Sequence, residues 1–267
     1  MSRQPQEIVD EVASLVQQGV REVVLVSENS TSYGKDLGDL RLLEELLVRL
    51  DAETGVSRLR VAYLQPAEVR PSLLAAMAKV DAVAGYYDLS FQHASATVLR
   101  RMRRFGGTKD FLELVSSVRA RDPEAGLRSN VIVGFPGETL GDFQELLDFL
   151  AAAQLDAIGV FGYSDEDGTE AASFVDKINQ DEVDRRVRVA TDVAEEVMAQ
   201  RAEDRVGTMV DVLVEDVSTE GASGRAAHQG PDDGSTLILN CTQPVGSYVR
   251  ALVVDTDGVD LIADASA

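Results

Sequence analysis

The segment that follows the first apolar run is rich in side chains that can bind a ligand. Residues 22–26, EVVLV, are short, apolar and β-branched, which predicts a buried strand. The next residues, 27–32, read SENSTS and offer a hydrogen-bonding side chain at every position. Because α/β folds bind ligands at the carboxyl ends of parallel strands, this polar stretch is a candidate ligand-binding loop. A solvated surface turn explains this stretch alone equally well.

Two further groups of candidates lie near the middle of the chain. Gln92 and His93 end the strand-like run YYDLSF, where a capped strand end with a satisfied histidine is the alternative. Residues 99–104, LRRMRR, are the one basic cluster, and most of its arginines are expected on a solvated helix face. Either Arg103 or Arg104 has the forked geometry that clamps a carboxylate.

A strand-like run with a glycine-proline turn, LRSNVIVGFP, forms the next candidate. Asn130 lies within the run, and Gly134, Phe135 and Pro136 make the turn. Glycine lets a backbone approach a flat ring closely. A plain connection from a strand to a helix explains the glycine and proline nearly as well.

Two loops carry less distinctive residues. Ser164, Glu166 and Thr169 belong to the loop SDEDGT, which either lines a substrate opening or forms a flexible acidic lip. His228 has no second histidine or cysteine at ligand spacing, so we expect no metal site there.

The composition narrows the class of protein. With 46 acidic and 25 basic residues the formal charge is −21, which repels nucleic acid and attracts a basic partner. A hydrophobic content of 45% is sufficient for a packed core. No apolar run approaches the roughly 18–20 residues of a membrane span. The single cysteine, Cys241, excludes an internal disulfide framework and suits the cytoplasm.

The order of elements predicts an α/β domain over residues 1–204. Strand-like and helix-like segments alternate there, which indicates a parallel sheet in a partial TIM-type barrel. The chain begins on a helix, so we expect the first barrel strand to be missing. Residues 205–267 contain five short strand-like runs separated by Gly, Asp and Pro, which predict a small antiparallel barrel of the OB type. The expected strands are 22–27, 58–64, 86–91, 127–136 and 156–164, and the expected helices are 5–18, 39–51, 71–80, 139–153 and one ending near 204, with Ser95 and Thr108 as N-caps.

Several stretches together resemble one family. VSENSTSYGKDLG, YLQPAE, YYDLSFQHAS, VLRRMRRFG, NVIVGFPGET and DAIGVFGYSDEDGT occur in this order in the radical S-adenosylmethionine methylthiotransferases, and the C-terminal part resembles their TRAM domain. The resemblance covers about residues 2–263. In that family a CxxxCxxC segment and a further N-terminal domain hold 4Fe–4S clusters, whereas this chain has only Cys241. We therefore expect a C-terminal fragment that is inactive alone.

The resemblance assigns expected roles to the candidates. It implies S-adenosylmethionine as the cofactor, with the polar loop at its amino end, Gln92 near the ribose and the glycine turn along the adenine. Arg104 is the candidate for the cofactor carboxylate, and His93 remains undecided between site and core. The expected cofactor-binding residues are Glu28, Asn29, Ser30, Gln92, His93, Arg104, Asn130, Gly134, Phe135 and Pro136, and the expected substrate-facing residues are Ser164, Glu166 and Thr169.

Members of this family act on different substrates. Some add a methylthio group to the β-carbon of an aspartate in small-subunit ribosomal protein S-twelve, and others modify adenosine in transfer RNA. Residues 205–267 contain three basic and ten acidic residues, a net charge of −7, and Tyr248 is their only aromatic residue. RNA binding by this domain is therefore disfavoured, and a basic ribosomal protein is the expected partner. Modification of transfer RNA and a non-catalytic binding module remain the alternatives.

Overall fold

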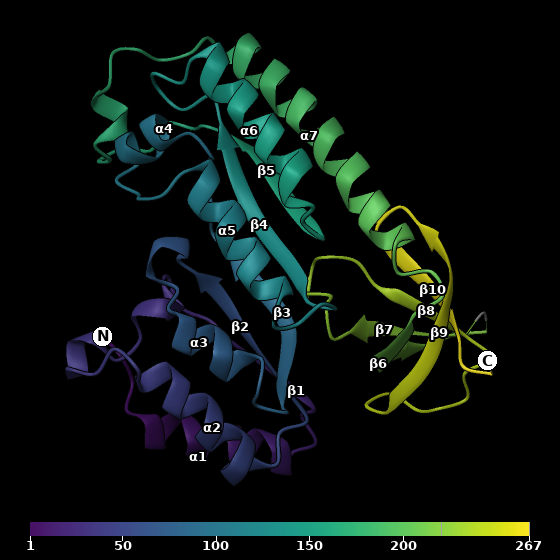
Figure 1. The fold of residues 1–267 in the computed structure, drawn as a ribbon. Helices are drawn as coiled ribbons and strands as arrows, with labels where there is room; N and C mark the ends of the chain where they lie inside the picture. The colour runs from purple at the N-terminus through teal and green to yellow at the C-terminus, as the bar shows by residue number, and fades with distance from the viewer. Residues whose placement is uncertain (220, 267) are drawn as a thin grey trace.

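The computed structural model describes residues 1–219 and 221–266, which form a curved parallel sheet followed by a small closed barrel (Figure 1). The sheet has the order β1-β2-β3-β4-β5, and all its neighbours pair in parallel. Its strands are β1 (Glu22–Leu25), β2 (Arg58–Leu64), β3 (Val83–Leu89), β4 (Gly126–Val133) and β5 (Ala157–Gly162). The helices are α1 (Pro5–Gln17), α2 (Leu42–Thr54), α3 (Pro71–Met77), α4 (Ala96–Arg101), α5 (Thr108–Arg119), α6 (Leu140–Ala153) and α7 (Gln180–Glu203). The predicted partial barrel is confirmed.

The two faces of the sheet differ in chemistry because side chains alternate along each strand. On β4, Leu127, Val131 and Val133 are buried in the core shared with the helices. Arg128 and Asn130 alternate with them and point to the opposite, concave face. The helices cover the convex face as a row (Figure 1). The concave face is therefore the polar side of the sheet.

Local capping explains where two helices begin. Ser95 accepts a hydrogen bond from the Thr97 amide at the start of α4, as the sequence predicted. The prediction that Thr108 caps α5 is wrong, because Gly107 holds that position and Thr108 is the first helical residue. The Thr108 hydroxyl instead donates to the carboxylate of Glu145 on α6, at 2.7 Å.

The small barrel contains β6 (Met209–Val217), β7 (Ala222–Ala226), β8 (Thr236–Leu239), β9 (Tyr248–Asp257) and β10 (Asp260–Asp264). The ring is closed in the order β10-β8-β7-β6-β9. The predicted small antiparallel barrel is confirmed, with one exception in its pairing, because β8 and β10 run parallel. Five strands cannot alternate in direction around a closed ring, so at least one neighbouring pair must be parallel.

The long helix α7 leads from the last strand of the sheet to the barrel, which lies beside the amino ends of the sheet strands (Figure 1). The helix ends at Glu203 and the first barrel strand begins at Met209. None of the helices within residues 1–219 and 221–266 has the length and apolar character needed to cross a bilayer.

Candidate functional site

The loops that follow β1 and β2 are tied together at the carboxyl end of the sheet. Ser30 is buried, and its hydroxyl donates to the Ala62 carbonyl at 2.6 Å. Asn29 reaches further, because its side-chain amide donates to Glu68 at 3.1 Å. Glu28 is exposed and makes no hydrogen bond with any other described residue. Of the three predicted residues, Ser30 therefore shapes the loop, whereas Glu28 is free to meet a ligand.

Gln92 and His93 are adjacent in sequence but face different surroundings. The Gln92 backbone continues the pairing of β3 with β4 past the end of β3, since its amide donates to the Asn130 carbonyl and its carbonyl accepts from the Ile132 amide. Its side chain has no hydrogen bond within the described residues, and it lies at the rim. His93 is fully buried, and its Nδ1 accepts from the Ser95 amide at 3.0 Å. His93 is therefore a core residue, but only Nδ1 is satisfied, because its Nε2 has no hydrogen-bond partner among the described residues.

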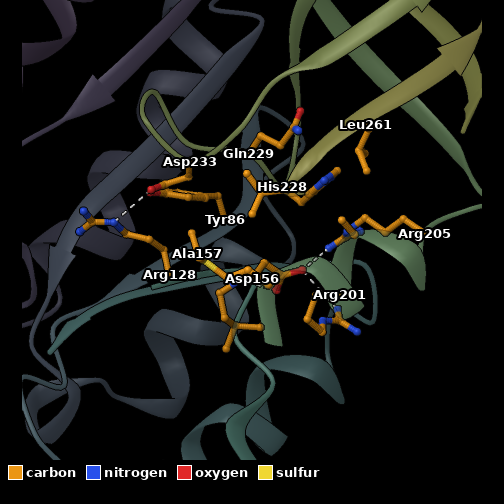
Figure 2. Close-up of a pocket in the computed structure, with 14 residues that line it drawn as sticks. Tyr86, Arg128, Asp156, Ala157, Arg201, Arg205, His228, Gln229, Asp233 and Leu261 are labelled. Atoms are coloured by element: carbon orange, nitrogen blue, oxygen red, sulfur yellow. Dashed lines mark hydrogen bonds and ion pairs between the residues drawn. The ribbon is translucent and has the colours of Figure 1, made fainter. Parts of the chain in front are cut away.

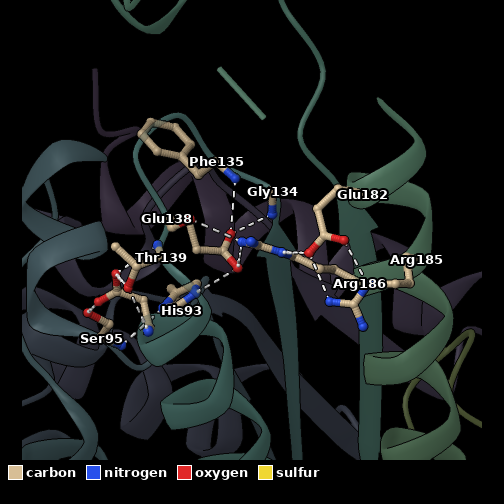
Figure 3. A network of polar contacts seen from close by, with 10 residues as sticks. His93, Ser95, Gly134, Phe135, Glu138, Thr139, Glu182, Arg185 and Arg186 are labelled. Atoms are coloured by element: carbon tan, nitrogen blue, oxygen red, sulfur yellow. Dashed lines mark hydrogen bonds and ion pairs between the residues drawn. The ribbon is translucent and has the colours of Figure 1, made fainter. Parts of the chain in front are cut away.

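A buried carboxylate holds the glycine turn after β4 (Figure 3). Glu138 accepts hydrogen bonds from the amides of Gly134 and Phe135, the latter at 3.1 Å. Arg186 of α7 pairs with the same carboxylate at 2.9 Å, and the nearest imidazole nitrogen of His93 is 4.0 Å away. Gly134 has φ +78°, and a Cβ there would lie 2.6 Å from a Val183 methyl group. The turn is therefore fixed from behind and leaves no space for a larger residue.

Sequence reasoning missed Glu138. The available signal was a carboxylate placed four residues after Gly134, inside a turn from a strand to a helix, where two backbone amides need an acceptor. Pro136, also a predicted site residue, accepts at its carbonyl from Arg101 at 2.9 Å. Its backbone is thus engaged with α4.

Asn130 presents an unpaired acceptor to the concave face. Its side-chain oxygen is buried and has no hydrogen-bond partner among the described residues. The oxygen lies over Gly159 of β5, where an added Cβ would be only 2.4 Å away. A buried acceptor without a partner is costly. The position fits a ligand donor, such as the amino group of a purine.

Arg104 reaches the rim between β2 and β3. Its guanidinium donates to the Gln65 side chain at 2.5 Å and to the Ser90 carbonyl at 3.4 Å. Partial burial lowers the pKa of Arg104, although the group stays cationic. Arg103, the neighbouring candidate, points to solvent and pairs with Glu170. Of these two candidates, Arg104 therefore lies at the carboxyl ends of β2 and β3, whereas Arg103 does not.

The predicted substrate-facing residues lie on the exposed loop after β5. Thr169 donates from its amide and its hydroxyl to the Glu166 carbonyl, at 3.2 and 2.8 Å. Ser164 and Glu166 are exposed. The hydrogen bonds of Thr169 thus remain within its own loop, and no described hydrogen bond joins these three residues to the other rim loops.

The rim at the carboxyl ends of the sheet strands contains polar groups of the kinds that a zwitterionic nucleotide needs. It offers the free carboxylate of Glu28, the unpaired oxygen of Asn130, the side chain of Gln92 and the cation of Arg104. These groups match an ammonium, a purine amine, hydroxyls and a carboxylate, which are the polar groups of S-adenosylmethionine. An iron–sulfur cluster does not fit this chain, because clusters need several thiolates and Cys241 is the only cysteine. Within residues 1–219 and 221–266 no group of three metal-ligating side chains gathers.

Comparison with known proteins identifies two domains and several relatives of this chain. Residues 1–150 match the Radical SAM superfamily and residues 206–265 match the TRAM domain. The chain is 58% identical over 264 residues to "Ribosomal protein uS12 methylthiotransferase RimO" of Saccharopolyspora erythraea, covering 98% of this chain and 54% of the relative. Proteins of the same name from Nocardioides sp. and Streptomyces coelicolor are 57% and 54% identical, covering 98% and 99% of this chain and 56% and 55% of the relatives.

The fold has solved counterparts, although at low sequence identity. Coproporphyrinogen III oxidase of Escherichia coli, described as a radical SAM enzyme, matches with a TM-score of 0.53 and 16% identity, covering 75% of this chain and 48% of that one. This likeness concerns the fold alone. The chain spans about half the length of the curated relatives it matches. It belongs to the radical SAM superfamily, with a TRAM domain at its C-terminal end.

Proposed function

We propose that this chain is the cofactor-holding and docking part of a radical S-adenosylmethionine methylthiotransferase. The substrate would be an aspartate of small-subunit ribosomal protein S-twelve, modified in the cytoplasm. The observation that carries the proposal is the 58% identity over 264 residues to a protein named for this activity. That similarity runs through both the rim and the small barrel, so it concerns cofactor binding and partner docking together.

The rim residues would divide the binding of S-adenosylmethionine among them. Glu28 would accept from the ammonium group, and Arg104 would pair with the carboxylate. Gln92 would meet the ribose and Asn130 the adenine, with the backbone of the Gly134 turn alongside. Together with a reduced 4Fe–4S cluster, the cofactor would supply the one-electron chemistry that cleaves an unreactive C–H bond. The thiolates for such clusters would come from outside this chain.

Glu138 would act through the turn and not by touching the cofactor. Its carboxylate keeps the amides of Gly134 and Phe135 in place, and Arg186 balances its buried charge. Ser164, Glu166 and Thr169, on the exposed loop after β5, would line the substrate opening. Glu138 would thus support the turn that binds the cofactor, whereas the loop after β5 would face the protein substrate.

The charge of the small barrel supports a basic protein partner over RNA. Arg205 pairs with Asp156 at 2.7 Å, and Arg225 pairs with Glu22 at 3.0 Å, so both guanidinium groups are already engaged. In the described part of the barrel, Arg250 is the basic residue that stays exposed without an ion pair. A surface with so few free cations gains little from phosphate contacts. It is complementary to a basic ribosomal protein.

A chimera tests the proposal with a complete enzyme. The matching half of the Streptomyces coelicolor relative is replaced by this chain, the clusters are reconstituted without oxygen, and ribosomal protein S-twelve is examined by peptide mass spectrometry. We expect a methylthio group on one aspartate. A matched chimera with Asn130→Ala should need more S-adenosylmethionine for half-maximal rate. A correctly loaded chimera that leaves the ribosomal protein unmodified would overturn the proposal, and salt-sensitive modification of transfer RNA would favour the other substrate.

A further inference from the structure

The second strand of the sheet contains a bulge at its carboxyl end. Val61 pairs with Tyr87 and Leu64 pairs with Leu89, so three steps on β2 oppose two on β3. Val61 and Leu64 both lie in the core shared with the helices, whereas Tyr63 is 42% exposed. Bulges are frequent beside active sites, where they redirect a side chain. This bulge turns Tyr63 away from the core, toward the rim.

The Tyr63 backbone is held in an unfavourable conformation. Its φ of +56° lies in the left-handed region, which is strained for a residue other than glycine. Such a conformation persists where the surroundings fix it. Asp88, which is almost fully buried, accepts from the Tyr63 amide at 2.8 Å. The Ser30 hydroxyl donates to the Ala62 carbonyl, which belongs to the same peptide group as the Tyr63 amide, so this peptide group is restrained at both its oxygen and its nitrogen.

A chain of charged groups connects this restraint to the small barrel. Arg128 of β4 donates to Asp88 at 3.1 Å and to Asp233 at 3.4 Å. Asp233 lies on the barrel loop between β7 and β8, and it also accepts from the Tyr86 hydroxyl at 2.6 Å. Burial, and secondly the negative charge of Asp233, raise the pKa of Tyr86, which keeps that hydroxyl a donor. Figure 2 shows Asp233 directed toward Arg128 and Tyr86 at the junction.

We propose that Tyr63 contacts S-adenosylmethionine at the rim and that the small barrel positions it through Asp233, Arg128 and Asp88. The contact rests on the function proposed above. A half-exposed phenol offers a flat apolar face and a hydroxyl, and its ring attracts a cation such as a sulfonium. Each link of the relay is a hydrogen bond or an ion pair between residues far apart in sequence. The docked barrel thus takes part in shaping the cofactor site at the opposite end of the strands.

The first test examines the relay in this chain without any cofactor. The protein is labelled with 3-fluorotyrosine, and the Tyr63 fluorine resonance is assigned as the one lost in Tyr63→Phe. We expect Asp233→Asn to shift the Tyr63 resonance. Asp232→Asn is the matched control, because it makes the same charge change at an exposed neighbouring residue. An unchanged Tyr163 resonance shows that the fold is intact. A Tyr63 resonance that stays in place in Asp233→Asn would overturn the relay.

The second test concerns the contact and uses the reconstituted chimera. S-adenosylmethionine binding is measured by calorimetry together with the Tyr63 resonance. We expect the cofactor to shift that resonance, Tyr63→Ala to weaken binding severalfold and Tyr63→Phe to recover most of it. Asp233→Asn should raise Kd, and Asp232→Asn should leave it unchanged. If the cofactor binds without moving the Tyr63 resonance, the contact is wrong and the proposed function survives. If the cofactor does not bind to the chimera, both the Tyr63 contact and the proposed function are wrong. The first test still decides whether Asp233 positions Tyr63.

Discussion

Replacing Arg60 by alanine should loosen the junction between the sheet and the small barrel. The side chain of Arg60 is fully buried on β2. Its guanidinium donates to the carbonyls of Ala227 and Ala226 at 2.7 and 3.0 Å, and it lies 3.0 Å from the Glu22 carboxylate. Arg60→Ala removes all three interactions at once, although the Ala226 carbonyl keeps the Gln229 amide as a donor at 3.1 Å.

The expected loss can be bounded from these contacts. Removing one member of a buried ion pair costs about 3–5 kcal/mol, because the remaining charge stays buried. Glu22 would keep two cationic neighbours, Arg225 at 3.0 Å and Arg58 at 3.6 Å, so its charge would remain balanced. We therefore expect the lower end, about 3 kcal/mol in the free energy of unfolding. That is a large fraction of the roughly 5–15 kcal/mol typical of a whole protein.

Urea unfolding followed by circular dichroism measures this loss. Arg250→Ala is the matched control, because Arg250 is exposed on β9 and has no ion pair among the described residues. The control should change the free energy of unfolding by less than about 0.5 kcal/mol. A loss below about 1 kcal/mol for Arg60→Ala would show that Arg60 does not hold the sheet and the small barrel together, since removing one member of a buried ion pair costs more than that.

Three further predictions concern the junction and the glycine turn. Gly126→Ala should lower the free energy of unfolding, measured in urea, by about 1–3 kcal/mol, because the new Cβ would lie 2.0 Å from the His228 carbonyl oxygen. Gly141→Ala, where a Cβ has room, should raise it by about 0.5–1 kcal/mol. Equal effects of the two substitutions would contradict the clash. Burial and the surrounding guanidinium groups hold the pKa of His228 well below its ordinary 6.5, so the unfolded chain binds the proton at a higher pH than the folded chain does. The free energy of unfolding should therefore fall as the pH drops through about 6.5. If Tm falls equally steeply with pH in His228→Gln, His228 is not the origin of this dependence. Glu138→Ala should lower the free energy of unfolding by about 3 kcal/mol, because Arg186 remains buried but keeps Glu182 as a partner. A variant that melts at the wild-type temperature would show that Glu138 does not stabilise the turn after β4.

The sequence pattern was sufficient for the main elements of the sheet. Residues 58–64 were predicted as a strand, and β2 spans Arg58–Leu64, because alternating apolar residues read directly as one buried face. The same alternation gave no sign that Arg58 and Arg60 donate to carbonyls of the small barrel, since that contact depends on how two distant parts dock. The sequence pattern of a strand is the same whether its charged residues contact water or a second domain.

The candidate site was predictable in its position and less so in its residues. Strand order placed the polar loops at one rim, as the fold class requires. The bulge at Tyr63 escaped prediction because its stabilising acceptor, Asp88, is 25 residues away in sequence. The buried state of His93 and the role of Glu138 depend likewise on the packing of α6 and α7 behind the turn. Residues that hold a site from behind require the tertiary structure to be recognised.

Hydrogen–deuterium exchange of the reconstituted chimera tests the central claim most directly. The claim is that one rim, formed by the loops after the sheet strands, binds S-adenosylmethionine. Adding the cofactor should slow exchange in peptides that cover residues 27–32, 90–93 and 130–137, and leave residues 209–264 of the small barrel unchanged. Protection confined to the small barrel, or to the convex helices, would show that the cofactor binds elsewhere and would contradict the claim.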